Sequence, residues 1–132
     1  MIPDLPDNID SIKGFLSADE AAALYNRALE VSGQGPVLEI GSYCGKSTIY
    51  LGLACRRTGS TVFALDHHRG SEEHQLGEFF HDPDLYDRSE GVMDTFRDFR
   101  QNISSAGLND TVVPVVAGSD AAARHWQTPF SM

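Results

Sequence analysis

A glycine-rich segment between a short apolar run and a helical pattern constrains the fold of this chain most. The run Val37-Leu38-Glu39-Ile40 is apolar except for Glu39, and Gly41 closes it. Gly45 then opens a helical pattern that extends to about Arg57 and stops before Gly59. A buried strand that leads through a glycine turn into a helix is typical of parallel α/β sheets.

The same alternation of strand and helix recurs along the chain. Ser17 and Glu20 have the spacing of a capping box, which predicts a helix start. Pro114 interrupts the third apolar run and favours an edge position for that strand. The predicted elements are a helix from 17 to about 31, strands at 37–40, 61–66 and 111–117, and helices at 45–57, 93–106 and 120–126. This order predicts an α/β fold, a Rossmann-like parallel sheet with flanking helices, truncated after the third strand.

The domain organisation predicted from this pattern is a single domain over residues 1–132. Residues 1–16, rich in Pro, Asp and Asn, read as an irregular lead-in. Residues 67–90 are polar and dense in His, Asp and Glu, and we interpret them as an insertion or lid loop. A three-stranded sheet leaves an exposed edge, through which the chain could form a homo-oligomer.

Composition excludes several classes of partner. Hydrophobic residues make up 41% and charged residues 22% of the 132 residues, which is ordinary for a folded domain. The net charge of -9 disfavours nucleic acid and anionic membrane surfaces as partners. The two cysteines, Cys44 and Cys55, fit free thiols in a reducing cytoplasm, and no signal peptide or membrane span is visible.

The candidate ligand site lies where the predicted strands end. Glycines at 41 and 45 allow a sharp turn and a close approach of a ligand to the backbone. Asp66 follows the second strand at the distance where Rossmann-type sites place the acid that binds ribose hydroxyls. Parallel sheets bind ligands at the carboxyl ends of their strands, so we expect Gly41, Asp66 and Gly118 to approach one site.

Three kinds of ligand compete for this turn. A Walker A phosphate loop needs four residues between its first glycine and Gly-Lys-Ser, and only three separate Gly41 from Gly45. A dinucleotide fingerprint needs a glycine where Tyr43 stands. The third ligand, S-adenosylmethionine, carries no phosphate, and an acid at Glu39 suits its positively charged amino acid part.

Three segments in order resemble class I methyltransferases that depend on S-adenosylmethionine. Residues 37–48 resemble motif I of the small-molecule O-methyltransferase-like group, whose loop reads E-I-G-x-x-x-G-x-S. Residues 62–66 resemble the second strand with its ribose acid, and residues 115–120 resemble the third strand and the turn beside adenine. The resemblance implies S-adenosylmethionine as cofactor, bound by Glu39, Gly41, Ser42, Tyr43, Gly45, Ser47, Asp66, His67, Ser119 and Asp120.

The chain departs from the family pattern at two places. An acid often follows the glycine of the third turn, but here Ser119 does and Asp120 comes one residue later. The family fold has about seven strands, so its C-terminal half, with the residues near the substrate, is absent. No catalytic residue is assigned; His67, His68 and His74 are only candidates for a general base.

The remaining candidates have simpler readings. A cluster that includes Glu72, Glu73, His81 and Asp82 beside the histidines matches no metal motif, and we assign no metal. Lys46 reads as a solvated helix residue and Cys44 as a loop thiol. We therefore expect methyl transfer to a small-molecule acceptor, at a hydroxyl. The alternatives are a P-loop-like NTPase or kinase using Gly45-Lys46-Ser47, or a non-catalytic fragment that binds S-adenosylmethionine.

Overall fold

A three-stranded parallel sheet forms the centre of the protein. The computed structural model describes residues 2–70 and 82–132. The sheet consists of β1 (Val37–Ile40), β2 (Val62–Asp66) and β5 (Val112–Val116), in the order β1-β2-β5. Val37 lies opposite Val62, and Val62 lies opposite Val112. The predicted parallel sheet is confirmed, and β5, which contains Pro114, lies at an edge as expected.

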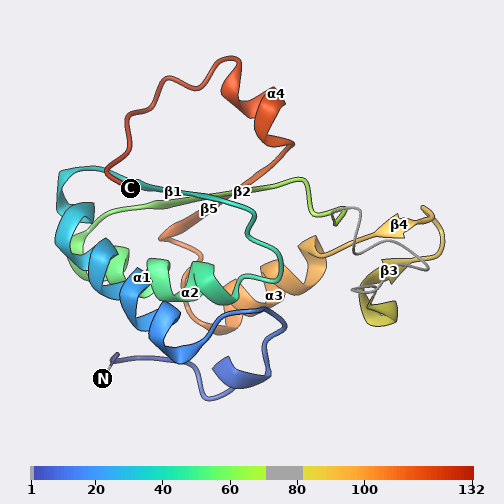
Figure 1. Ribbon diagram of the computed structural model, residues 1–132, viewed down its shortest axis with the longest axis horizontal. Helices are drawn as coiled ribbons and strands as arrows, with labels where there is room; N and C mark the ends of the chain where they lie inside the picture. Colours follow the sequence, from blue (N-terminus) through green and yellow to red (C-terminus); the bar gives the residue numbers. More distant parts are fainter. Residues whose placement is uncertain (1, 71–81) are drawn as a thin grey trace.

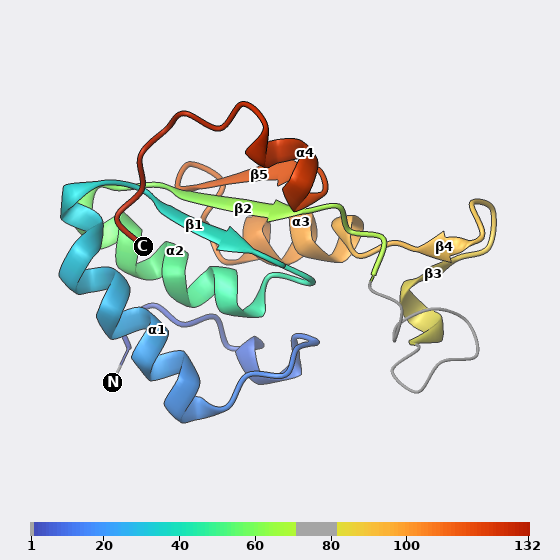
Figure 2. The same ribbon diagram turned by 45° about the horizontal axis from the view of Figure 1, so that its top comes forward.

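Three helices cover one face of this sheet (Figure 1). They are α1 (Ala18–Val31), α2 (Lys46–Thr58) and α3 (Phe96–Ser105). The short α4 (Ser119–Ala123) lies over the opposite face, as Figure 2 also shows. The Ser17–Glu20 capping box is formed, and α2 ends at Gly59 with a φ of 72°. Local sequence signals therefore set the ends of both longer helices.

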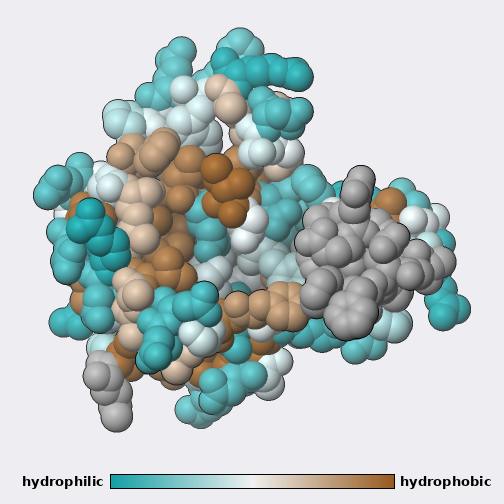
Figure 3. Space-filling model, viewed as in Figure 1, coloured by the Kyte–Doolittle hydropathy of each residue, from teal (hydrophilic) through white to brown (hydrophobic). Residues whose placement is uncertain are grey.

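The core fills the layer between the sheet and these helices. Its largest fully buried side chains include Ile49 and Leu53 of α2, Phe99 of α3 and Val62 of β2. The opposite face is covered less completely. Trp126 packs edge-on against Phe63 with ring centroids 5.4 Å apart. Ile40 at the end of β1 remains 65% exposed, and apolar surface gathers over the sheet in Figure 3.

The C-terminal segment lies beside β1. Ser131 N–H donates to Pro36 O at 2.8 Å, and Leu38 N–H donates to Met132 O at 2.9 Å. Two backbone hydrogen bonds thus extend the sheet on the side of β1 that faces away from β2.

Four segments differ from the sequence prediction. A hairpin of β3 (Tyr86–Asp87) and β4 (Val92–Met93) replaces part of the loop predicted at 67–90, preceded by a 3₁₀ turn at Pro83–Leu85. Met93 belongs to β4, so α3 begins three residues later than predicted; α4 ends at Ala123 instead of at 126. Two-residue strands carry no period that a sequence pattern can reveal.

The lead-in is irregular but packed. It contains a 3₁₀ turn at Ile9–Ser11, and the side chains of Ile9 and Ile12 are buried in the core. A second 3₁₀ turn at Ser32–Gln34 joins α1 to β1. In the described part of the chain, no helix has the length and apolar composition needed to cross a membrane.

Candidate functional site

A pocket of about 400 Å³ opens where β1 and β2 end. Its volume falls within the range of cofactor sites. Four parts of the chain contribute: the turn after β1 with the start of α2, the end of β2 with its following residues, the lead-in before α1, and the start of α3. The lining residues are Lys13, Gly14, Phe15, Leu16, Gly41, Ser42, Tyr43, Lys46, Ser47, Asp66, His67, Gly70 and Thr95.

The turn after β1 takes a left-handed backbone at three positions. The φ angles are 88° at Gly41, 52° at Tyr43 and 91° at Gly45. Gly41 N–H donates to Leu65 O at 2.8 Å, which places the ends of β1 and β2 at the same rim of the sheet. A left-handed φ is free of steric cost only for glycine, so Gly41 and Gly45 meet a backbone requirement of this turn.

Asp66 connects the turn to the end of β2. Its Oδ2 accepts a hydrogen bond from Tyr43 N–H at 2.8 Å, and its Oδ1 accepts one from His68 N–H at 2.9 Å. Each carboxylate oxygen has a second lone pair, so Asp66 retains the capacity to accept hydrogen bonds from a ligand in the pocket that it lines. The structure thus brings Gly41 and Asp66 into one pocket, as the sequence predicted.

Glu39 contacts the start of α2 instead of lining the pocket. Ser47 Oγ donates to Glu39 Oε2 at 2.6 Å, and Thr48 Oγ1 donates to Glu39 Oε1. Burial raises the pKa of Glu39; the two hydroxyls oppose this shift, and the nearby Asp66 adds to it. These hydroxyls satisfy a carboxylate that would otherwise be costly to bury.

The raised pKa of Glu39 gives a prediction for stability. Its protonated form is favoured in the folded state, so its contribution to stability is present at low pH and is lost as the pH rises above its ordinary value of 4.5. Glu39→Gln removes this titration. We expect the variant to gain stability relative to the wild type as the pH rises from 4.5 to 7.5, measured by urea unfolding. Glu30→Gln on the exposed face of α1 is the control. If the stability of Glu39→Gln relative to the wild type stays constant or falls as the pH rises, the prediction is contradicted.

Of the ten predicted cofactor-binding residues, six line this pocket: Gly41, Ser42, Tyr43, Ser47, Asp66 and His67. Gly45 instead packs against α3, since a Cβ at this position would lie 3.2 Å from Phe99 Cδ2. Ser119 and Asp120 begin α4 and are outside the lining. The contacts of Ser119 and Asp120 with adenine therefore stay a prediction, since neither residue lines this pocket.

The lead-in contributes to the pocket, which was not predicted from the sequence. Residues 13–16 form one wall of the pocket, and Lys46 and Thr95 add to it from the starts of α2 and α3. Lys46 was expected to be a solvated helix residue. Nothing in the composition of residues 1–16 points to a site, because their place there depends on how Ile9 and Ile12 pack into the core. The available signal was the presence of Ile9 and Ile12, two large apolar residues in a segment otherwise rich in Pro and Asp.

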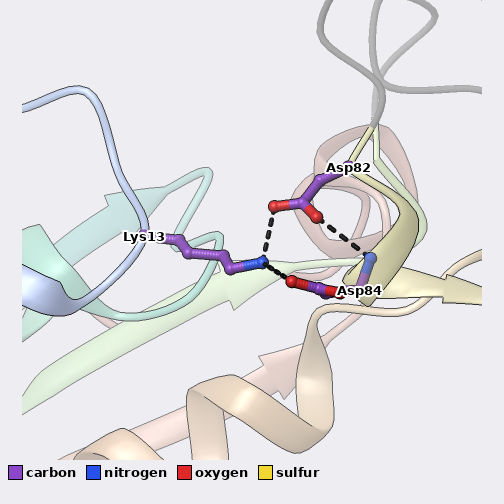
Figure 4. A network of polar contacts seen from close by, with 3 residues as sticks. All are labelled: Lys13, Asp82 and Asp84. Carbon is purple, nitrogen blue, oxygen red and sulfur yellow. Dashed lines mark hydrogen bonds and ion pairs between the residues drawn. The ribbon is translucent and has the colours of Figure 1, made fainter.

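Lys13 ties this wall to the segment that precedes the hairpin. Its Nζ lies 2.6 Å from Asp82 Oδ2 and 3.2 Å from Asp84 Oδ2 (Figure 4). Partial burial acts to lower the pKa of Lys13, but the hydrogen bonds and charges of the two aspartates outweigh it and raise the pKa. The ammonium group is therefore neutralised by two carboxylates.

The histidines at the end of β2 lie in different environments. His67 lines the pocket, and its Nδ1 accepts a hydrogen bond from Arg69 N–H at 3.0 Å. In the neutral ring this arrangement places the proton on Nε2, so His67 presents a donor there and not a base. His68 is 2% exposed, hydrogen-bonds Thr95 Oγ1 through Nδ1, and burial lowers its pKa. The third candidate base, His74, is outside the described residues.

Two further candidates concern thiols and metals. Cys44 is buried, and burial, with the charge of Asp98 as the next cause, raises the pKa of its thiol to about 12. The thiol is thus protonated near neutral pH, as expected for a loop thiol. Residues 2–70 and 82–132 contain no group of three metal-binding side chains. Half of the candidate metal cluster, Glu72, Glu73, His74 and His81, is outside the described residues.

The profile of the family described as "Methyltransferase domain" matches residues 38–132, which include β1, the turn and the end of β2. The crystal structure of cofactor-bound Rv0187 from MTB is similar, with a TM-score of 0.59 and 22% sequence identity. The match covers 92% of this chain and 46% of that chain, so this chain spans about half the length of its structural neighbour. Since the family profile extends over more than half of the chain and the sheet is parallel and Rossmann-like, the protein belongs to the methyltransferase domain family, in its class I form.

Proposed function

We propose that the pocket binds S-adenosylmethionine and that the protein serves methyl transfer to the hydroxyl of a small molecule. The observation that carries the proposal is that Gly41 and Asp66 line the same pocket. The glycine turn and a carboxylate that can accept hydrogen bonds from ribose hydroxyls thus lie at one site. Ser42 supports the fit, because its Oγ is buried at the pocket and has no hydrogen-bond partner among the described residues. A buried hydroxyl without a partner is uncommon in the absence of a ligand.

The geometry disfavours the phosphate-binding alternative. A phosphate cradle needs backbone N–H groups that point at the ligand. Tyr43 N–H instead donates to Asp66, and Gly45 N–H donates to Ser42 O at 2.9 Å. The Asp66 carboxylate at the same rim would also repel phosphate. Membership in the methyltransferase family agrees with this reading.

When bound, the cofactor would supply an electrophilic methyl group on its sulfonium. The acceptor oxygen would take this methyl and release its proton to water, and S-adenosylhomocysteine would be left. The contribution of this chain is to hold the nucleoside by Asp66 and the turn at 41–47, so that the acceptor can approach in line. His67 presents a donor at Nε2 and His68 is buried, so neither is assigned as a base. We propose a cytoplasmic protein whose acceptor is a small molecule. Self-association through a sheet edge is disfavoured, because Ser131 and Met132 bond to the outer side of β1 and Pro114 removes a donor from the outer side of β5.

Calorimetry on the full chain tests this function. We expect saturable binding of S-adenosylmethionine and S-adenosylhomocysteine, and no binding of Mg-ATP. Binding of Mg-ATP without S-adenosylmethionine would overturn the proposal, and binding of neither would do the same. Incubation with S-adenosylmethionine and a catechol, followed by measurement of S-adenosylhomocysteine, separates an enzyme from a fragment that only binds the cofactor.

A further inference from the structure

Lys46 carries a positive charge at an unfavourable position. It is the first residue of α2, a helix of 13 residues, and it lines the pocket. The N-terminal end of a helix has a partial positive charge, so a cation there is destabilising and an acid is preferred. The first turn of α1 follows the usual pattern, with Asp19 and Glu20. The stability of α2 therefore does not explain why a lysine stands at position 46.

No carboxylate of the described residues neutralises Lys46. The ion pairs of the described residues involve Lys13, Arg27 and Arg56, and none involves Lys46. This is unexpected in a chain with 19 acidic and 10 basic residues. Lys13, the second lysine of the pocket, is bound to Asp82 and Asp84. Lys46 is thus the lysine of the pocket that retains an unneutralised charge.

Polar groups beside Lys46 share this lack of partners. The N-cap residue of α2 is Gly45, which has no side chain to cap the first N–H groups of the helix. Ser42, which also lines the pocket, is 2% exposed, and its Oγ has no partner in the part of the chain that the structure describes. A buried hydroxyl, uncapped helix N–H groups and an ammonium group together form a set of donors without an acceptor.

The stem of Lys46 is held against the lead-in. A Cβ at Gly14 would lie 3.2 Å from Lys46 Cβ and 3.3 Å from its Cδ. The absence of a side chain at Gly14 lets the backbone of the lead-in approach the methylene groups of the lysine. This contact restricts the side chain and keeps it at the wall of the pocket.

We propose that Lys46 is a specificity residue that binds a carboxylate in this pocket. The inference rests on the proposed function and deepens it. The carboxylate comes from the amino acid part of the cofactor or from an acidic acceptor, and both would meet the same donors. A carboxylate is favoured over a phosphate because three N–H groups of the turn, those of Gly41, Tyr43 and Gly45, are already bonded within the protein.

The test uses Lys46→Gln, which removes the charge and keeps the Cβ and Cγ methylene groups beside Gly14. Calorimetry compares S-adenosylhomocysteine with its decarboxylated analogue, which keeps the nucleoside and the amine. If the cofactor supplies the carboxylate, we expect the variant to bind S-adenosylhomocysteine about tenfold more weakly. Binding of the analogue should not change, and Lys46→Arg should restore the affinity. The midpoint of thermal unfolding should not fall, since the substitution removes a cation from a helix N-terminus.

A second arm identifies an acidic acceptor. With the cofactor site saturated by S-adenosylhomocysteine, 3,4-dihydroxybenzoate and catechol are titrated into both proteins. A preference for the benzoate that Lys46→Gln abolishes assigns the carboxylate to the acceptor. If neither arm distinguishes the variant from the wild type, the inference is overturned while the proposed function stands. If the wild type does not bind S-adenosylhomocysteine, the proposed function itself fails, so the two failures are distinguishable.

Discussion

Replacing Asp66 by asparagine should weaken the binding of S-adenosylhomocysteine roughly 100-fold, because hydrogen bonds to a charged acceptor contribute about 1.5–3 kcal/mol each. Asp66 is the carboxylate of the pocket that faces the expected ribose, and it also accepts N–H groups from Tyr43 and His68. Asparagine offers one acceptor oxygen in place of two. One of these backbone N–H groups would then meet an amide NH₂, and the turn would shift as well.

The measurement is calorimetry with S-adenosylhomocysteine and with 5′-methylthioadenosine, which shares the ribose but lacks the amino acid part. Asp66→Asn should weaken both ligands, whereas Lys46→Gln should spare 5′-methylthioadenosine. The control is Asp110→Asn, an exposed aspartate outside the pocket with the same change in charge. Unaltered affinity of the Asp66 variant for both ligands would show that the pocket does not hold a ribose at this carboxylate.

Gly45→Ala should lower the free energy of unfolding by about 2–4 kcal/mol, as the sum of two costs. The first cost is a left-handed backbone, since φ at Gly45 is 91°. The second cost is steric. The new methyl group would lie 3.2 Å from Phe99 Cδ2 and 3.4 Å from Ile103 Cδ1, and both side chains are buried.

A matched substitution separates these two costs. Gly59 has a φ of 72°, and a Cβ at this position would have no neighbour within 4 Å. Gly59→Ala should therefore cost only about 1 kcal/mol, from the backbone alone. Urea unfolding of both variants gives the comparison. Equal losses would show that Phe99 and Ile103 move aside, so that the contact between the turn and α3 does not contribute.

The elements that carry a periodic pattern could be predicted from the sequence. The capping box at Ser17 and the glycine at 59 set helix ends that the structure confirms. The apolar runs at 37–40 and 62–66 form neighbouring parallel strands, and this pairing brings Gly41 and Asp66 to one rim. Local chemistry determines these features, so a single sequence is enough to predict them.

Other features depend on contacts between distant segments. The wall formed by residues 13–16 requires the lead-in to fold back over α2, and the hairpin at 86–93 has strands of only two residues. The contacts of Glu39 also differ from the prediction. Glu39 was predicted to contact the cofactor, whereas Ser47 and Thr48, eight and nine residues later, donate hydrogen bonds to it. Such pairings are set by tertiary packing, which a linear pattern does not encode.

Pro114 affects whether strands of other copies can pair with the outer side of β5. Val62 N–H donates to Thr111 O and Ala117 N–H donates to Asp66 O, so the odd-numbered residues of β5 bond towards β2 and the even-numbered ones face outward. Among the outward-facing residues, Val112 donates its N–H to Leu108 O, and Pro114 has no backbone N–H. A strand of another copy that approached this side of β5 would find no free N–H donor at Val112 or Pro114. The outer flank is thus a poor template for fibrous growth, although its valines at 113 and 116 are exposed to water.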